Sequence, residues 1–228
     1  MESHNDFDNR IVYKYITEYI NSQIQPNRVK IDELYKNILY KDKLTEIENS
    51  FVVPIRPEVM KLIEVLLHIL KPQKILEIGT GFGYSAICIQ KTSGATVHTI
   101  EKNVHNAEIA QENIDRFGLK HNIKVIVGDS DNEINTLIEM YDFILLDGSK
   151  GQYIKLLDRL LSKLRTGGVL FADNVLYHGA VANNKLVDPK KRSTTRRLQE
   201  FIKQICFRID LTTSIVPIGD GVSISYKL

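Results

Sequence analysis

Two separated segments of the sequence carry oxygen-bearing side chains in a pattern that can hold a metal ion. The segment LLDGSK places Asp147 directly after an apolar stretch and Lys150 three residues later, and the segment LFADNV places Asp173 and Asn174 after another. Both stretches read as buried strands, and the carboxyl ends of adjacent parallel strands meet at one edge of a sheet. We therefore expect Asp147, Asp173 and Asn174 to form one metal site, with Lys150 beside it.

The ligand types select both the ion and the chemistry. Two carboxylates and one amide oxygen, without cysteine or histidine, favour a hard cation such as Mg²⁺, which Mn²⁺ can replace in vitro. Such an ion can chelate two vicinal oxygens of a substrate and lower the pKa of the reacting hydroxyl. Asp147 and Lys150 are the expected catalytic residues, because Lys150 is placed to take the proton or to stabilise the oxyanion. The alternative, that Asp173 and Asn174 only cap a turn, is the weaker interpretation because Asp147 and Lys150 accompany them.

An earlier segment predicts a nucleotide-type cofactor site. Residues 77–83, EIGTGFG, lie between an apolar strand and a helix, where glycines let the backbone approach a ligand and the helix N-terminus offers free N–H groups. Their spacing, G-x-G-x-G, differs from the dinucleotide fingerprint G-x-G-x-x-G. Glu101 ends the next strand, from which a carboxylate can accept hydrogen bonds from ribose hydroxyls. Asp129 and Ser130 end the third strand and suit an adenine base; the alternative is that all of these are only turn residues.

The elements that must position these residues follow an alternating pattern. The apolar runs KILEI, TVHTIE, IKVIVGD, YDFILLD and GVLFAD alternate with helix-like segments, as is typical of a parallel sheet covered by helices on both faces. The last segment, LTTSIVPIGDGVSISYK, reads as two strands joined by a tight turn at residues 219–221. The expected fold class is α/β: a Rossmann-like seven-stranded sheet, mostly parallel, with a C-terminal antiparallel hairpin and helices on both faces.

The composition fits a single domain spanning residues 1–228. With 43% apolar residues, 228 residues can bury one core, and amphipathic spacing near the start suggests an N-terminal helical arm or lid over residues 1–50. Lys and Arg exceed Asp and Glu by only 30 − 28 = 2, so the overall charge does not predict nucleic-acid binding. No apolar run approaches the roughly 20 residues that span a bilayer, and we expect a cytoplasmic protein without a membrane partner.

One short segment, residues 185–197, is strongly basic although the whole chain is not. Its basic residues are Lys185, Lys190, Lys191, Arg192, Arg196 and Arg197. A cluster of this kind, close in sequence to the metal-binding segment, can hold the phosphates of RNA. The alternative is a solvated helix start capped by Ser193 or Thr194. Tyr153 and Tyr177 are candidates for stacking on a flipped base, with ordinary packing as the alternative.

Taken together, these motifs resemble the cation-dependent O-methyltransferases related to catechol and caffeoyl-CoA O-methyltransferase. The resemblance lies in LEIGTGFGYSA, the strand ending at Glu101, LLDGSKGQY and FADNVLYHGAV, and it covers nearly all of residues 50–228. It implies that S-adenosylmethionine is the methyl donor, that Asp147, Asp173 and Asn174 hold the metal, and that Lys150 is the base. The donor has no pyrophosphate, so the missing dinucleotide spacing is no loss.

The same resemblance implies a cofactor pocket and an assembly. The residues expected to bind the cofactor are Val53, Glu77, Gly79, Gly81, Tyr84, Ser85, Glu101, Asp129, Ser130 and Asp147. Related enzymes are commonly dimers with N-terminal helices near the active site, so we expect a homodimer.

Three motifs bear on which acceptor substrate is methylated. Within the family, DGSKGQY, DNVLYHGAV and PIGDGVSISYK most resemble bacterial methyltransferases that act on 5-hydroxyuridine at the tRNA wobble position. That base carries two vicinal oxygens, as catechol does, so one metal geometry serves both. We expect methylation of tRNA 5-hydroxyuridine to 5-methoxyuridine, with Lys190, Lys191, Arg192, Arg196 and Arg197 on the RNA. The alternatives are a small catechol or hydroxycinnamoyl-type substrate and, against the motif set, a nicotinamide-dependent oxidoreductase or a non-catalytic nucleotide-binding domain.

Overall fold

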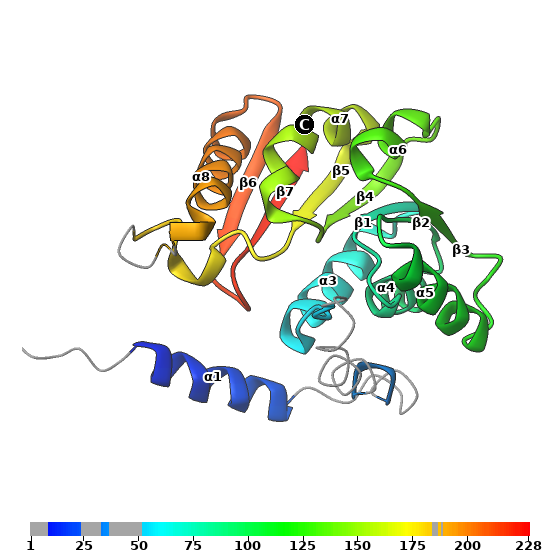
Figure 1. Ribbon diagram of the computed structural model, residues 1–228, viewed down its shortest axis with the longest axis horizontal. Helices are drawn as coiled ribbons and strands as arrows, with labels where there is room; N and C mark the ends of the chain where they lie inside the picture. The colour runs from blue at the N-terminus through cyan, green and yellow to red at the C-terminus, as the bar shows by residue number, and fades with distance from the viewer. Residues whose placement is uncertain (1–8, 24–32, 37–51, 184–186, 188) are drawn as a thin grey trace, which may run out of the picture.

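The computed structural model describes residues 9–23, 33–36, 52–183, 187 and 189–228. Within these residues seven strands form one sheet, in the order β3-β2-β1-β4-β5-β7-β6 (Figure 1). The strands are β1 Lys74–Ile78, β2 Thr96–Glu101, β3 Ile123–Val127, β4 Tyr141–Leu146, β5 Leu164–Ala172, β6 Leu211–Val216 and β7 Val222–Lys227. Strands β1 to β5 pair in parallel, and β7 pairs antiparallel with both β5 and β6. The expected fold class is thus confirmed.

Helices cover both faces of this sheet. They are α3 Pro57–Leu70, α4 Tyr84–Ser93, α5 Val104–Arg116, α6 Ser130–Thr136, α7 Tyr153–Lys163 and α8 Arg192–Phe207, whereas α1 Asn9–Gln23 contacts α3. Short 3₁₀ turns, η2 Lys150–Gln152, η3 Tyr177–Gly179 and η5 Pro189–Lys191, lie in the connections between strand and helix near the candidate site. The crossover helices require the parallel strands to end at one common edge, which is where the predicted polar residues lie.

The central strands are buried on both faces, which explains their nearly continuous apolar sequence. In β1, Ile75 packs with α3, α4 and α5, whereas its neighbour Leu76 packs with α6, α7 and α8. In β5, Phe171 and Leu170 divide between the same two layers. Alternate residues of one strand therefore join different halves of the core, and a polar residue within such a strand must be buried on one of these faces.

The local signals at helix and strand ends act where the sequence predicts. Pro57 occupies the first turn of α3, where a missing N–H costs nothing. Gly118 follows α5 with φ of +70°, a conformation that suits glycine after a helix. Residues 217–221 join β6 to β7 as a tight turn. These three signals fix the ends of the elements that surround the candidate site.

The first fifty residues are only partly described. Helix α1 contacts α3, and residues 33–36 form one helical turn. The remainder of the predicted arm or lid lies outside the described residues, so its role as a lid stays a prediction. Over the described part of the chain, every helix is too short or too polar to traverse a lipid bilayer.

Candidate active site

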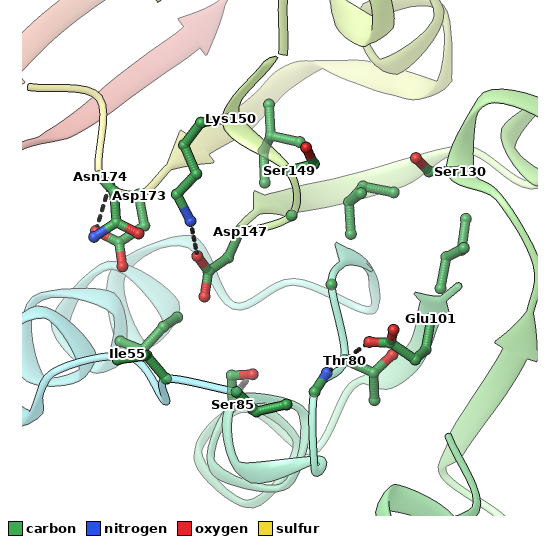
Figure 2. Close-up of a pocket in the computed structure, with 18 of the residues that line it drawn as sticks. Ile55, Thr80, Ser85, Glu101, Ser130, Asp147, Ser149, Lys150, Asp173 and Asn174 are labelled. Atoms are coloured by element: carbon green, nitrogen blue, oxygen red, sulfur yellow. Dashed lines mark hydrogen bonds and ion pairs between the residues drawn. The ribbon is translucent and has the colours of Figure 1, made fainter. Parts of the chain in front are cut away.

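The carboxyl ends of the parallel strands open onto a cavity of about 820 Å³. Figure 2 shows Asp147, Lys150, Asp173 and Asn174 on one side of it and Thr80, Glu101 and Ser130 on the other. The predicted residues that line it are Val53, Gly79, Gly81, Tyr84, Ser85, Glu101, Asp129, Ser130, Asp147, Lys150, Asp173 and Asn174. The structure therefore brings the predicted cofactor and metal segments to one hollow.

The glycine loop after β1 depends on a close approach of two backbones. Gly79 has φ of +99°, and a Cβ on it would lie 2.5 Å from the carbonyl oxygen of Asp147. A side chain at position 79 would therefore push the loop away from the end of β4. The N–H of Gly81, in the same loop, donates to Glu101 Oε2 at 2.9 Å, so the loop is tied to both neighbouring strand ends.

Glu101 and Asp129 are held by short bonds to the backbone near the surface. Glu101 Oε1 accepts from the N–H of Asn103 at 2.9 Å. Asp129 caps α6 through the N–H of Asp131 at 3.0 Å, and Lys102 Nζ lies 2.7 Å from its other oxygen. Hydrogen bonding from Lys102, followed by the Asp131 N–H, lowers the pKa of the Asp129 carboxyl. These two carboxylates remain acceptors for neutral hydroxyl and amine groups.

Glu77 differs from the other predicted cofactor residues because it does not line the cavity. Its side chain is fully buried behind the glycine loop, where Thr99 donates to Oε2 at 2.5 Å. Its Oε1 has no hydrogen-bond partner among the described residues. Burial, opposed by hydrogen bonding from the Ser85 and Thr99 hydroxyls, raises the pKa of Glu77 to about 8. Glu77 faces the same layer as Ile75, as strand alternation requires.

The opposite side of the cavity holds one buried and one partly buried carboxylate beside one ammonium. Asp147 directly follows β4, and Asp173 directly follows the adjacent strand β5. Lys150 Nζ lies 3.2 Å from Asp147 Oδ1 and is itself partly buried. Asp173 is only 3% exposed, and its Oδ1 accepts from the N–H of Asn174 at 2.7 Å. The predicted metal and catalytic residues are therefore neighbours.

Burial dominates the electrostatics of this pair. It raises the pKa of the Asp147 carboxyl, against the opposing charge of Lys150. It also raises the pKa of Asp173 to about 7, with the Asp147 carboxylate adding to the rise and the Asn174 N–H opposing it. Two desolvated carboxylates this close disfavour each other's charged form. A bound cation would relieve this repulsion.

Tyr153 contradicts the expectation that it stacks on a base. Its ring is fully buried against Phe201, and its hydroxyl lies 3.0 Å from the carbonyl oxygen of Leu146 and 3.1 Å from that of Asp173. The hydroxyl can therefore bridge the ends of β4 and β5. A buried tyrosine needs such a partner for its polar end, and this one lies directly beneath the two carboxylates.

The basic residues lie outside the cavity. Lys190 and Lys191 in η5, and Arg192, Arg196 and Arg197 in the first turns of α8, are all exposed. Lys191 Nζ lies 5.7 Å from the centre of the Tyr177 ring, which does line the cavity. The helix begins at Arg192 without a side-chain cap, so the expected cap at Ser193 or Thr194 is wrong. Lys185 lies outside the described residues.

Sequence reasoning missed other residues that line the cavity. They include Val52, Ile55, Arg56, Gln152, His178 and Asp220. Val52, Ile55 and Arg56 precede α3 and carry no motif, so only the folded chain places them in the cavity beside the predicted Val53. Asp220 stands in the predicted turn at residues 219–221. The two glycines account for the turn, so no feature of the sequence indicated that Asp220 lies in the cavity.

Comparison with known proteins gives a consistent family match. A model of the O-methyltransferase family matches residues 29–228. A caffeoyl-CoA O-methyltransferase of Stellaria longipes is 28% identical over 79% of this chain and 79% of that protein. A catechol O-methyltransferase of Niastella koreensis is 28% identical over 63% of this chain and 68% of that protein.

Solved structures show the same fold. An O-methyltransferase from Bacillus cereus in complex with S-adenosylhomocysteine has a TM-score of 0.79 at 24% identity, covering 94% of this chain and 97% of that one. A methyltransferase from Podospora anserina bound to the same compound has a TM-score of 0.84 at 19% identity and covers all of both chains. At such identities the likeness concerns the fold alone.

Proposed function

The chain belongs to the O-methyltransferase family, and from this premise we propose that it methylates a hydroxyl of a small catechol or hydroxycinnamoyl-type substrate with the help of a divalent cation. The methyl donor is S-adenosylmethionine, as for its homologues. One observation carries the acceptor and metal proposals: Asp147, Asp173, Asn174 and Lys150 share a cavity with the glycine loop. The names of the relatives, caffeoyl-CoA and catechol O-methyltransferase, support this substrate class over the tRNA substrate expected from the sequence. The same match argues against a nicotinamide-dependent enzyme.

The charges of the site support a metal ion. Asp173 is buried and the neighbouring Asp147 is partly buried, both carboxyls have raised pKa values, and the Lys150 ammonium lies 3.2 Å from Asp147 Oδ1. A pair of carboxylates completed by the Asn174 amide is an all-oxygen donor set suited to Mg²⁺ or Mn²⁺. When bound, the ion would hold two vicinal oxygens of the acceptor and lower the pKa of its reacting hydroxyl.

The chain's own residues would then divide the remaining work. The Glu101 carboxylate and the loop at Gly79 and Gly81 would hold the donor, since Glu101 keeps lone pairs beyond its two backbone bonds. Asp129 and Ser130 would take the adenine. From its place beside Asp147, Lys150 would accept the proton of the acceptor hydroxyl when its amine is neutral, or stabilise the oxyanion when it is the ammonium.

The deciding experiment supplies labelled S-adenosylmethionine and Mg²⁺ with a catechol, with caffeoyl-CoA, or with tRNA containing 5-hydroxyuridine. Each reaction has a matched EDTA control, and products are identified by mass spectrometry. EDTA-sensitive methylation of the catechol or the caffeoyl ester, with unmodified tRNA, supports the proposal. Methylation that persists in EDTA would show that the reaction does not need a divalent cation and would contradict that part of the proposal.

A second candidate function, methylation of tRNA 5-hydroxyuridine, is favoured by one structural observation. Helix α8 begins with basic residues, although cations are unfavourable near a helix N-terminus. The same free N–H groups and side chains would favour a phosphate. Lys191 reaches the Tyr177 ring at the cavity wall, so a phosphate held there would belong to a substrate whose base enters the cavity. 5-Methoxyuridine in the tRNA reaction above would establish this candidate.

The expected homodimer also remains a proposal. Helices α1 and α3 contact each other, and both expose apolar side chains. These are Tyr15, Ile16, Tyr19 and Ile20 on α1 and Val65 and Ile69 on α3. A second copy of the chain would remove them from water. Light scattering after size exclusion would detect it, and a monomeric mass at micromolar concentration would contradict it.

A further inference from the structure

The loop after β5 holds an unusual backbone at the edge of the cavity. Asn174, Tyr177 and His178 have φ of 56°, 49° and 56°, in the left-handed region that residues with a Cβ rarely adopt. Such strain persists only where the surroundings determine the conformation, and it gathers at functional sites. Asn174 is a proposed metal ligand, and Tyr177 and His178 line the cavity. The groups that hold this loop in place therefore affect the positions of the residues that line the site.

The turn between β6 and β7 supplies these restraints. The carbonyl oxygen of Gly221 accepts from the N–H of Val175 at 2.8 Å, and that of Asp220 accepts from Leu176 at 3.0 Å. The side chain of Asp220 adds a third bond, because its Oδ1 accepts from the N–H of His178 at 2.5 Å. Gly221 is in close contact as well: a Cβ there would lie 2.1 Å from Leu176 Cγ.

The Asp220 side chain bonds to the backbone of the loop, and we assign it this role rather than that of another metal ligand. Among the described residues no cluster of three or more His, Cys, Asp or Glu side chains is found that could hold a metal, and, besides burial and the Asp147 carboxylate, the charge of Asp220 adds to the raised pKa of Asp173. The Asp220 side chain is only 10% exposed, and the His178 imidazole, 75% exposed, lies 3.5 Å from the same oxygen. The backbone bond is the shorter of the two contacts.

We propose that Asp220 is a positioning residue that holds Asn174 and Tyr177 in place for the metal and the acceptor through its bond to the His178 N–H. The inference rests on the proposed function, because it assigns Asn174 to the metal. It adds a residue from the C-terminal hairpin to a site otherwise built from the ends of parallel strands. The site would then depend on β6 and β7 as well as on β4 and β5.

The test compares Asp220→Ala with Asp220→Asn, whose amide oxygen can still accept from the His178 N–H. We expect Asp220→Ala to weaken Mn²⁺ binding by about 10-fold or more, as outer-shell partners of metal sites do, and to raise the acceptor KM. Asp220→Asn should stay within about 3-fold of the unmodified protein by the same reasoning. S-adenosylhomocysteine affinity should be the same in all three, since its proposed residues lie at β1 to β3.

Further measurements separate a positioning role from a charge effect or a folding defect. His178→Ala keeps the backbone N–H and should leave Mn²⁺ affinity unchanged. In the unmodified protein, hydrogen exchange of the His178 amide should be slowed like that of Val175 and Leu176, although its side chain is exposed. This last measurement needs no variant, so it decides even if Asp220→Ala does not fold.

The results that contradict the positioning role differ from those that contradict the proposed metal. Normal Mn²⁺ binding by Asp220→Ala, equal losses in Asp220→Ala and Asp220→Asn, a loss in His178→Ala, or an unprotected His178 amide would overturn the positioning role. Failure of the unmodified protein to bind Mn²⁺ would instead remove the metal from the proposed function. The two failures are therefore distinguishable.

Discussion

The two sides of the cavity hold their carboxylates in opposite ways. On the β1 to β3 side, Glu101 and Asp129 each accept backbone N–H bonds, and the pKa of Asp129 is lowered. On the β4 and β5 side, Asp173 is buried, Asp147 is partly buried, and the pKa values of both are raised. The first arrangement suits neutral donors such as ribose hydroxyls, and the second suits a cation. The same side-chain type is thus fitted to two ligands by its surroundings.

The largest expected effect comes from removing a carboxylate of the β4 and β5 side. Asp173→Ala should lower turnover by about 10³-fold or more, because the proposed electrostatic stabilisation of the oxyanion would be lost. Mn²⁺ binding should disappear, while S-adenosylhomocysteine affinity stays nearly unchanged. Calorimetric titration with each ligand measures this. Asp158→Ala is the matched control, since Asp158 is a surface aspartate paired with Arg208. Equal losses of both ligands would contradict the division of the cavity.

On the β1 to β3 side we expect a variant to lose affinity for S-adenosylhomocysteine and to keep its affinity for Mn²⁺. Glu101→Ala removes the acceptor for the Gly81 N–H and the proposed acceptor for ribose, so S-adenosylhomocysteine affinity should fall about 10- to 100-fold, as for the loss of charged hydrogen bonds. Mn²⁺ affinity should be retained. The same pair of titrations measures both. A variant that loses Mn²⁺ as well would show that the two sides are not separable.

A smaller effect on substrate binding is expected for the basic residues of α8, which lie outside the cavity. Reversing Arg192 and Arg196 to glutamate should weaken an RNA substrate by about 10-fold and flatten its salt dependence if α8 holds phosphates. Methylation of a catechol should stay the same. Steady-state rates at two salt concentrations measure this. Equal losses for RNA and catechol would count against a phosphate role.

The smallest expected effect concerns stability. The folded pKa of Glu77, about 8, lies above its ordinary value of 4.5, so folding keeps a proton that the unfolded chain has released between these pH values. This contribution is fully present below pH 4.5 and is lost as the pH rises toward 8. Glu77→Gln should therefore gain in Tm relative to the unmodified protein as the pH rises from 7 to 8, by about 3 °C. A constant Tm difference across this range would show that Glu77 does not keep its proton.

Much of this site could be predicted because it lies at strand ends. Asp147, Asp173 and Glu101 each follow or end an apolar strand, and parallel topology brings such ends together. The Tyr153 bridge could not be predicted, since burial and the direction of its hydroxyl depend on how α7 and α8 pack. Asp220 was missed for a related reason, because its bond to His178 joins segments 42 residues apart in the chain. Helix α8 begins before Ser193 because the preceding 3₁₀ turn leads directly into it.

The contact between Gly79 and the Asp147 carbonyl has a consequence for altering this enzyme. It joins the loop proposed for the donor to the strand end proposed for the acceptor through main chain alone, with no room for a Cβ. With the donor and the acceptor bound as proposed, the distance that the methyl group must cross would be set by a part of the molecule that has no room for a side chain. Redesign of the proposed acceptor range belongs instead in residues 177–178, which line the same cavity away from that contact.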